Sequence, residues 1–127
     1  MLAAGGDSSG GSTPTPSSSA AAGPSVQANI AAEVPATIKA KAPLQIATDA
    51  SYAPNEFVDL NGNIVGWDIE LAKDVCKVLG LTCTINNVTF SDIIPALLES
   101  PSKYQLSFSS YSPTTAREAK GIDFITY

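Results

Sequence analysis

The feature that most constrains the fold of this chain is a change of hydrophobic period between residues 44 and 86. Leu-Gln-Ile-Ala-Thr-Asp at residues 44–49 alternates well enough to form a strand. Residues 68–80 then place apolar side chains on one helical face and end at Gly80, and residues 81–86 alternate again. Because two strands joined by a helix pair in parallel, the sequence predicts an α/β fold with a parallel sheet covered on both sides.

Further elements are expected around and after this unit. Asp68 is expected to cap the first helix, and Ser91 or Asp92 the second. Pro95 would then fall in the first turn of the second helix, where proline is tolerated. The other predicted elements are a tight turn at 61–63 before an extended pair at 64–65, a second helix through residue 98, a strand over 104–109, a short helix over 114–119 and an extended segment over 122–127.

The first 36 residues differ from the rest of the chain in composition. Gly, Ser, Thr, Pro and Ala dominate them without a sustained apolar period, so they cannot bury enough surface to offset the entropy of ordering. We therefore predict a disordered tether over residues 1–36 and a folded domain over residues 37–127. From Leu44 onward, ten acidic and five basic residues account for the whole net charge of −5, which argues against a nucleic-acid partner.

The first eight residues, Met-Leu-Ala-Ala-Gly-Gly-Asp-Ser, are similar to the processing region of a bacterial lipoprotein. In such a region a small-residue triplet precedes a cysteine that becomes lipidated, and that cysteine is missing here. We expect a lipid anchor in the membrane only if the missing cysteine is native, and a chance likeness of low-complexity sequence is the alternative. No apolar run in the sequence approaches the length of about 20 residues that a membrane span requires.

Two cysteines, Cys76 and Cys83, are the only ones in the chain, which also lacks histidine. A zinc site would therefore lack its usual ligands, and we expect no metal or other cofactor. Cys76 falls near the end of the first predicted helix and Cys83 early in the next strand, so the chain reverses between them and a disulfide is feasible. Two buried free thiols are the alternative, and a disulfide would suit an exported protein.

The segment from Ser109 to Arg117 has the composition of an anion site. It combines hydroxyls and backbone N–H groups with one guanidinium. Thr114 is expected to be an N-cap, which places Arg117 at the third helical position, where a cation is unfavourable unless an anion also docks. A carboxylate bound bidentately by the guanidinium would satisfy this position, although an exposed arginine after a Ser/Thr-rich turn is the simpler alternative.

Polar and aromatic residues follow each of the predicted strands. Asp49 and Tyr52 come after the first strand, Phe90 after the second, and the Ser109 to Arg117 segment after the third. Ligands of parallel α/β sheets bind beyond the carboxyl ends of the strands, so these three loops predict a ligand site at one sheet edge. Each residue alone has a structural alternative: Asp49 could cap a turn, and the two aromatic rings could belong to the core.

Four stretches of this sequence, taken in order, resemble the extracytoplasmic solute-binding proteins of amino-acid ABC transporters, family 3. Gly-Trp-Asp-Ile-Glu-Leu-Ala-Lys at residues 66–73 corresponds to the family signature, and Tyr-Ala-Pro-Asn-Glu-Phe at 52–57 is similar to actinobacterial lipoprotein members. The four stretches are residues 47–54, 66–73, 90–97 and 109–117, the last together with Asp-Phe at 123–124.

The resemblance covers roughly residues 37–127, which correspond to the N-terminal part of lobe one in a two-lobed protein. It implies a type II periplasmic-binding-protein-like lobe, a three-layer sandwich around a parallel sheet, incomplete in this chain. It also implies a protein outside the cytoplasmic membrane, periplasmic or at the cell surface, that binds a polar amino acid and delivers it to an ABC-transporter permease.

The resemblance also assigns roles to the residues that match the motifs. Arg117 would hold the α-carboxylate of the ligand, helped by Ser110 and by the backbone near Ser112. Ser109 and Ser112 would lie near the α-amino group.

Three further positions are implied to face the ligand. Tyr52 would cover one side of it, Phe90 would pack against its aliphatic part, and Asp49 would face its side-chain end, where a carboxylate favours an amide or a cation. The Cys76 and Cys83 spacing also matches a disulfide of some basic-amino-acid binders of the family. Asn55, where many members have Phe, leaves the choice of ligand open.

Two alternative functions use the same fold. One is the ligand-sensing domain of a membrane receptor, and the other is a dehydratase-like enzyme acting on cyclic amino-acid precursors. We expect no enzyme activity, because the sequence offers no paired carboxylates, no nucleophile with a base and no metal cluster of the kind that catalysis requires.

Overall fold

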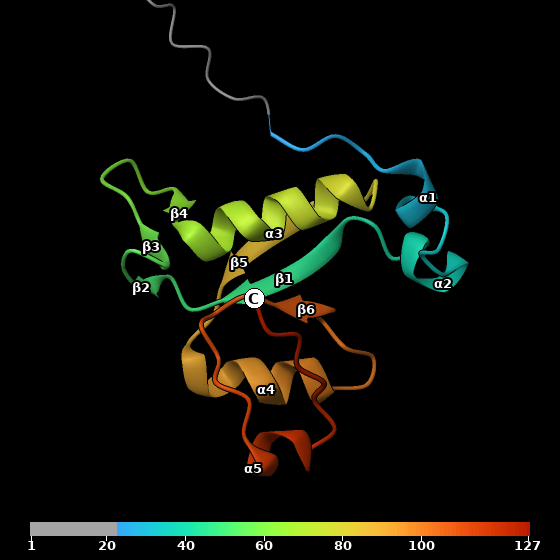
Figure 1. Ribbon diagram of the computed structural model, residues 1–127. Coiled ribbons are helices and arrows are strands. Elements are labelled where there is room, and N and C mark those ends of the chain that lie inside the picture. The colour runs from blue at the N-terminus through green and yellow to red at the C-terminus, as the bar shows by residue number, and fades with distance from the viewer. Residues whose placement is uncertain (1–22) are drawn as a thin grey trace, which may run out of the picture.

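The computed structural model describes residues 23–127, and Figure 1 shows its arrangement. The predicted tether at residues 1–22 and the lipoprotein-like start lie outside the described residues. The elements in chain order are α1 (Ala28–Ala31), α2 (Ala36–Lys39), β1 (Leu44–Thr48), β2 (Ser51–Tyr52), β3 (Glu56–Val58), β4 (Ile64–Val65), α3 (Trp67–Val78), β5 (Cys83–Asn87), α4 (Phe90–Leu98), β6 (Leu106–Ser107) and α5 (Thr115–Glu118).

The main sheet has the order β5-β1-β6 and is parallel throughout, which confirms the predicted fold class. Strand β1 lies in the centre, and its Ile46 pairs with Ile85 on one side and with Leu106 on the other. In Figure 1, α3 lies over one face of this sheet and α4 over the opposite face. The result is a three-layer arrangement in which the carboxyl ends of the three strands meet at one edge.

Alternation along β1 divides the core into two clusters. Ile46 packs with Ala72 and Cys76 of α3, whereas its neighbour Ala47 packs with Ile93 of α4 and with Tyr104. Successive side chains of a strand point to opposite faces, so this single strand supplies both layers. Both Ile46 and Ala47 are fully buried, as expected for a central parallel strand.

Helix α3 begins two residues earlier than predicted, and Asp68 does not cap it. The N-cap residue is Gly66, which has no side chain with which to cap, and Asp68 lies inside the first turn with its carboxylate buried against Ser110. The prediction of Asp68 as a cap was therefore wrong, because tertiary contacts take up a side chain of the type that favours capping.

Helix α4 also begins earlier than predicted. Its first residue is Phe90 and its N-cap is Thr89, so Ser91 and Asp92 are not the cap. Pro95 consequently lies in the helix interior and not in the first turn. Proline has no backbone N–H, so the helical hydrogen bond that residue 95 would otherwise donate is absent.

The C-terminal elements agree with the sequence in part. Thr114 caps α5, its hydroxyl accepting from the Arg117 amide at 3.3 Å, as predicted. The third strand is shorter than expected, since β6 spans only Leu106–Ser107. Residues 122–127 form no strand, contrary to the extended segment predicted there.

Two short helices precede the first strand. Helix α1 falls within the segment predicted to be a tether, and the Gln27 amide before it donates to the Val78 carbonyl at the end of α3. Within residues 23–127, no helix has the length and apolar character that crossing a bilayer demands.

A small antiparallel sheet of order β2-β3-β4 stands beside the main one (Figure 1). Its last two strands are joined by the predicted turn, where the Asp59 carboxylate accepts from the Asn61 and Asn63 amides at 2.8 and 2.9 Å. Glu56 in β3 pairs with Tyr52 in β2, and Glu56 is the buried member of that pair. This small sheet therefore brings one carboxyl group into the interior beside α3.

Cys76 of α3 and Cys83 of β5 form a disulfide, with Cα atoms 6.3 Å apart. Replacing both cysteines by serine is expected to lower the free energy of unfolding by about 2 to 3 kcal/mol, because a crosslink over seven residues restricts the unfolded chain. Urea unfolding of the double variant, compared with the oxidised protein, measures this loss. Reduction of the unmodified protein should produce a loss of similar size, and a midpoint that does not move would contradict the expectation.

Candidate functional site

The loops that follow β1 and β6 are tied together at the sheet edge. The Asp49 amide donates to the Ser109 hydroxyl at 2.9 Å, and Ser109 is only 3% exposed. The Ala50 amide donates to the Asn87 side chain at 2.9 Å, which adds the end of β5. Three strand ends predicted to converge are thus connected by hydrogen bonds.

The Asp49 carboxylate connects the β1 loop to the start of α4. One oxygen accepts from the Phe90 amide at 2.8 Å, and the other accepts from the Ser51 hydroxyl at 2.5 Å. The Phe90 amide is one of the helix-start donors that lack a partner inside the helix, so Asp49 caps α4 from another loop. Both carboxylate oxygens already have protein donors, so this geometry favours a supporting role for Asp49.

An aromatic pair with a cation above it forms the other side of the edge. The rings of Phe90 and Tyr111 are stacked with centroids 4.3 Å apart, and the Tyr111 hydroxyl donates to the Phe90 carbonyl at 2.8 Å. The Arg117 guanidinium carbon lies 4.9 Å from the Tyr111 ring centre and 5.8 Å from that of Phe90. These distances are within the range of cation–π attraction.

The Arg117 side chain is half-buried and has a single hydrogen bond among the described residues. Its Nη1 donates to the Ser112 carbonyl at 2.7 Å. Because a guanidinium carries five N–H donors, four remain for an incoming group. The rings position a planar donor fork beside exposed backbone, and such a fork matches the geometry of a carboxylate.

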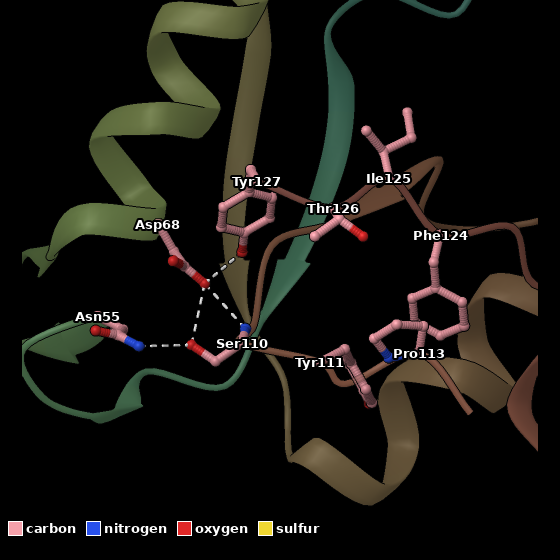
Figure 2. Close-up of a pocket in the computed structure, with 9 residues that line it drawn as sticks. All are labelled: Asn55, Asp68, Ser110, Tyr111, Pro113, Phe124, Ile125, Thr126 and Tyr127. Atoms are coloured by element: carbon pink, nitrogen blue, oxygen red, sulfur yellow. Dashed lines mark hydrogen bonds between the residues drawn. The ribbon is translucent and has the colours of Figure 1, made fainter.

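Ser110 lies at the centre of a partly buried polar network (Figure 2). Its amide donates to the Asp68 carboxylate at 2.9 Å, and the same carboxylate oxygen accepts from the Tyr127 hydroxyl at 2.8 Å. The Ser110 hydroxyl lies 2.9 Å from Glu56 Oε2 and 3.2 Å from that Asp68 oxygen, and it accepts from the Asn55 amide group at 2.9 Å. Ser110 has φ of 50°, an uncommon value for a residue other than glycine, and this network holds it there.

The pKa of Glu56 is raised from 4.5 to about 7. Burial is the main cause, since only 1% of the residue is exposed; a hydrogen bond from Ser110 to the ionised form opposes the shift, and the neighbouring Asp68 carboxylate adds to it. The pKa of Tyr111 is also raised, chiefly by burial, and that of Tyr127 is raised by desolvation of its hydroxyl together with its hydrogen bond to the Asp68 carboxylate, although the residue as a whole is 65% exposed.

A hollow of about 230 Å³ opens beside this network. Figure 2 shows Asn55 and Asp68 at the left, Tyr127 beside Asp68 above Ser110, and Pro113, Phe124 and Ile125 at the right. Of the seven residues predicted to bind ligand, only Ser110 lines it.

The structure brings most of the predicted site residues together. Asp49, Phe90, Ser109 and Arg117 are linked through hydrogen bonds or ring contacts, as described above, and Ser112 is exposed beside Arg117. Tyr52 is 59% exposed on β2. Their contacts with a ligand stay a prediction.

Sequence reasoning missed four participants. Tyr111, Asn55, Glu56 and Asp68 take part in the site, but none of them is among the residues predicted to bind ligand. Glu56 carried no sequence signal of its own, because it follows Asn55 and starts a short Glu-Phe-Val strand in which an acid would ordinarily be exposed.

Comparison with known proteins fits this architecture. The profile of the bacterial extracellular solute-binding proteins, family 3, matches residues 44–127, and the chain belongs to this family. It is 36% identical over 83 residues to the ABC transporter arginine-binding protein 1 of Escherichia coli K12, covering 65% of this chain and 33% of that protein. It is 37% identical over 75 residues to the histidine-binding periplasmic protein of Salmonella typhimurium LT2, covering 59% of this chain and 28% of that protein.

Among solved structures, the arginine-bound form of domain 1 of TmArgBP is similar with a TM-score of 0.55 and 38% identity. The match covers 60% of this chain and 59% of that domain. The fold is therefore that of part of a type II periplasmic-binding-protein domain. The chain spans about a third or less of the length of the curated relatives it matches.

Proposed function

We propose that this chain contributes the carboxylate-binding part of a site for a polar amino acid, in a protein that delivers its ligand to an ABC-transporter permease outside the cytoplasmic membrane. The observation that carries the proposal is the placement of Arg117 over the Phe90 and Tyr111 rings, with only one of its side-chain donors bonded within residues 23–127, in a chain of this family. A lipid anchor in the native form belongs to the same proposal.

The names of the relatives support a cationic amino acid as the first ligand to test. Two of the proteins compared above are named for binding arginine and one for binding histidine. The net charge of −5 favours the approach of a cation. Stacked rings at the site also provide a flat apolar surface for an aliphatic or guanidinium side chain.

The family favours binding over catalysis, since the matched relatives are named as binding proteins. A ligand-sensing domain would make the same contacts with its ligand. Binding experiments therefore identify the ligand but do not distinguish sensing from transport, which requires an uptake assay with the permease.

Replacing Arg117 by alanine is expected to weaken binding of L-arginine by the full-length protein at least tenfold. A charge-assisted hydrogen bond contributes about 1.5 to 3 kcal/mol, and this substitution removes a paired set. Isothermal titration calorimetry with L-arginine, followed by L-histidine, L-lysine and L-glutamine, measures the effect. Lys120→Ala is the control, because it removes an exposed cation just after the same helix. Equal affinity of Arg117→Ala and Lys120→Ala would reject the assigned role.

A further inference from the structure

The hydroxyl of Ser110 has more carboxyl neighbours than it has protons. A hydroxyl donates once and accepts twice. Ser110 accepts from Asn55, and its oxygen lies within hydrogen-bond distance of both Glu56 and Asp68. One proton cannot be donated to two carboxylates, so the second contact becomes favourable only when one carboxyl group is itself the donor.

The geometry identifies Glu56 as the carboxyl group that carries the proton. The Asp68 oxygen that faces Ser110 already accepts from the Ser110 amide and from the Tyr127 hydroxyl (Figure 2). Among residues 23–127, the Glu56 side chain bonds to the Ser110 hydroxyl and lies beside the Asp68 carboxylate, and it is fully buried. With a proton on Glu56, the Ser110 hydroxyl accepts from Asn55 and Glu56 and donates to Asp68, which satisfies all three of its positions.

The charged and titratable groups around Glu56 act in the same direction. Asp68 on α3 and Asp49 after β1 are acids that disfavour a charge on Glu56. Tyr127 donates to Asp68 nearby, and Tyr52 lies opposite Glu56 across the β2–β3 pair. Among the described residues, no basic side chain acts on Glu56 to lower its pKa. Loss of the proton therefore leaves a buried charge without a counterion.

Ser110 is also the link between this network and the proposed ligand site. The residue before it, Ser109, holds the Asp49 loop, and the residue after it, Tyr111, carries the stack under Arg117. The left-handed conformation of Ser110 sets the direction in which the chain continues. A change in its hydrogen bonds would therefore alter the placement of Tyr111 and of the Ser112 carbonyl that holds Arg117.

We propose that Glu56 is a positioning residue which, by holding a proton against the Ser110 hydroxyl, fixes the 109–117 loop in the geometry that binds the amino acid. This inference rests on the proposed function for its effect on affinity, whereas its effect on the loop does not. The protonated network binds ligand and the ionised one releases it.

The experiment follows the Ser110 amide and ligand affinity over the same pH range. In the full-length protein, the Ser110 amide resonance is expected to titrate with a midpoint near 7, the value of the Glu56 pKa. The dissociation constant for L-arginine is expected to rise about tenfold between pH 6 and pH 8, the factor for a site that binds only when protonated. In Glu56→Gln the amide group replaces the acid proton as donor to Ser110, so both profiles should become flat while binding persists.

Glu99→Gln is the matched control, since Glu99 is exposed after α4 and should leave both profiles unchanged. Ser110→Gly is a second variant: it keeps the left-handed conformation, removes the hydroxyl, and should also flatten the affinity profile. A Ser110 amide that does not titrate, or that still titrates in Glu56→Gln, overturns the inference. So does a titrating amide with an affinity for L-arginine that is equal at pH 6 and pH 8. Absence of binding at every pH rejects the proposed function, and the amide titration then decides the inference on the loop by itself.

Discussion

Replacing Gly66 by alanine is expected to lower the free energy of unfolding by at least about 3 kcal/mol, since it combines backbone strain with a steric clash. Gly66 has φ of 128°, and an added Cβ would lie 2.1 Å from the Asn55 carbonyl oxygen and 2.8 Å from that of Pro54. These two carbonyls accept from the first amides of α3: the Trp67 amide donates to Pro54 at 3.3 Å and the Asp68 amide donates to Asn55 at 3.0 Å. Relief of the clash therefore requires the helix start and the β2–β3 turn to separate.

The measurement is urea unfolding of Gly66→Ala, with Gly62→Ala as the matched control. Gly62 also has a positive φ, of 84°, but an added Cβ meets nothing within 4 Å. Its replacement should therefore cost only the strain, about 1 kcal/mol. Failure of Gly66→Ala to fold while Gly62→Ala folds would agree with the large effect. Equal losses in the two variants would show that the close approach at Gly66 contributes nothing.

The central architecture could be predicted from sequence because local pattern and tertiary structure agree there. The alternation at residues 44–49 and the helical period at 68–80 are each long enough to show a period, and they belong to β1 and α3. Thr114 was also predicted correctly as a cap, because its hydroxyl bonds within its own helix. Such features depend on neighbours three or four residues away, and sequence records those neighbours directly.

The failures arise where a side chain is used by a distant segment. The Phe90 amide receives its capping carboxylate from Asp49, 41 residues away, so no cap is visible beside α4. Asp68 sits where a cap is expected but is bonded to Ser110, 42 residues away. The capping rule therefore names the wrong residue for both helices, because the actual partner depends on how the sheet edge assembles.

The candidate site also has one part that the sequence predicts and one part that it does not. Its position at the edge of the sheet follows from topology, because carboxyl ends of parallel strands meet there. The proton shared by Glu56 and Ser110 does not follow from topology, because it depends on burial beside a second acid on another element. Predicting it would require knowing which face of β3 is covered by α3.

The free energy of unfolding of the full-length protein is expected to fall by about 2 to 3 kcal/mol between pH 5 and pH 8 through Glu56 alone. Its folded pKa of about 7 exceeds the ordinary value of 4.5, so the folded state binds the proton more tightly than the unfolded state does. The stabilisation is complete below pH 4.5, it falls by about 1.4 kcal/mol per pH unit between pH 4.5 and 7, and it is lost once the pH has risen through 7. This direction is opposite to that of a carboxylate whose pKa is lowered by a salt bridge.

Chemical denaturation at several pH values tests this dependence, with Glu56→Gln and Glu99→Gln beside the unmodified protein. Glu56→Gln should lose the fall between pH 5 and pH 8, because its amide keeps the hydrogen bond to Ser110 and cannot ionise. Glu99→Gln should retain the fall, since its side chain is exposed. A Glu56→Gln protein that loses stability with pH as steeply as the unmodified one would assign the dependence to another group. Stability that rises with pH through this range would mean that the buried carboxyl is ionised in the folded state, and the proton count around Ser110 would then be wrong.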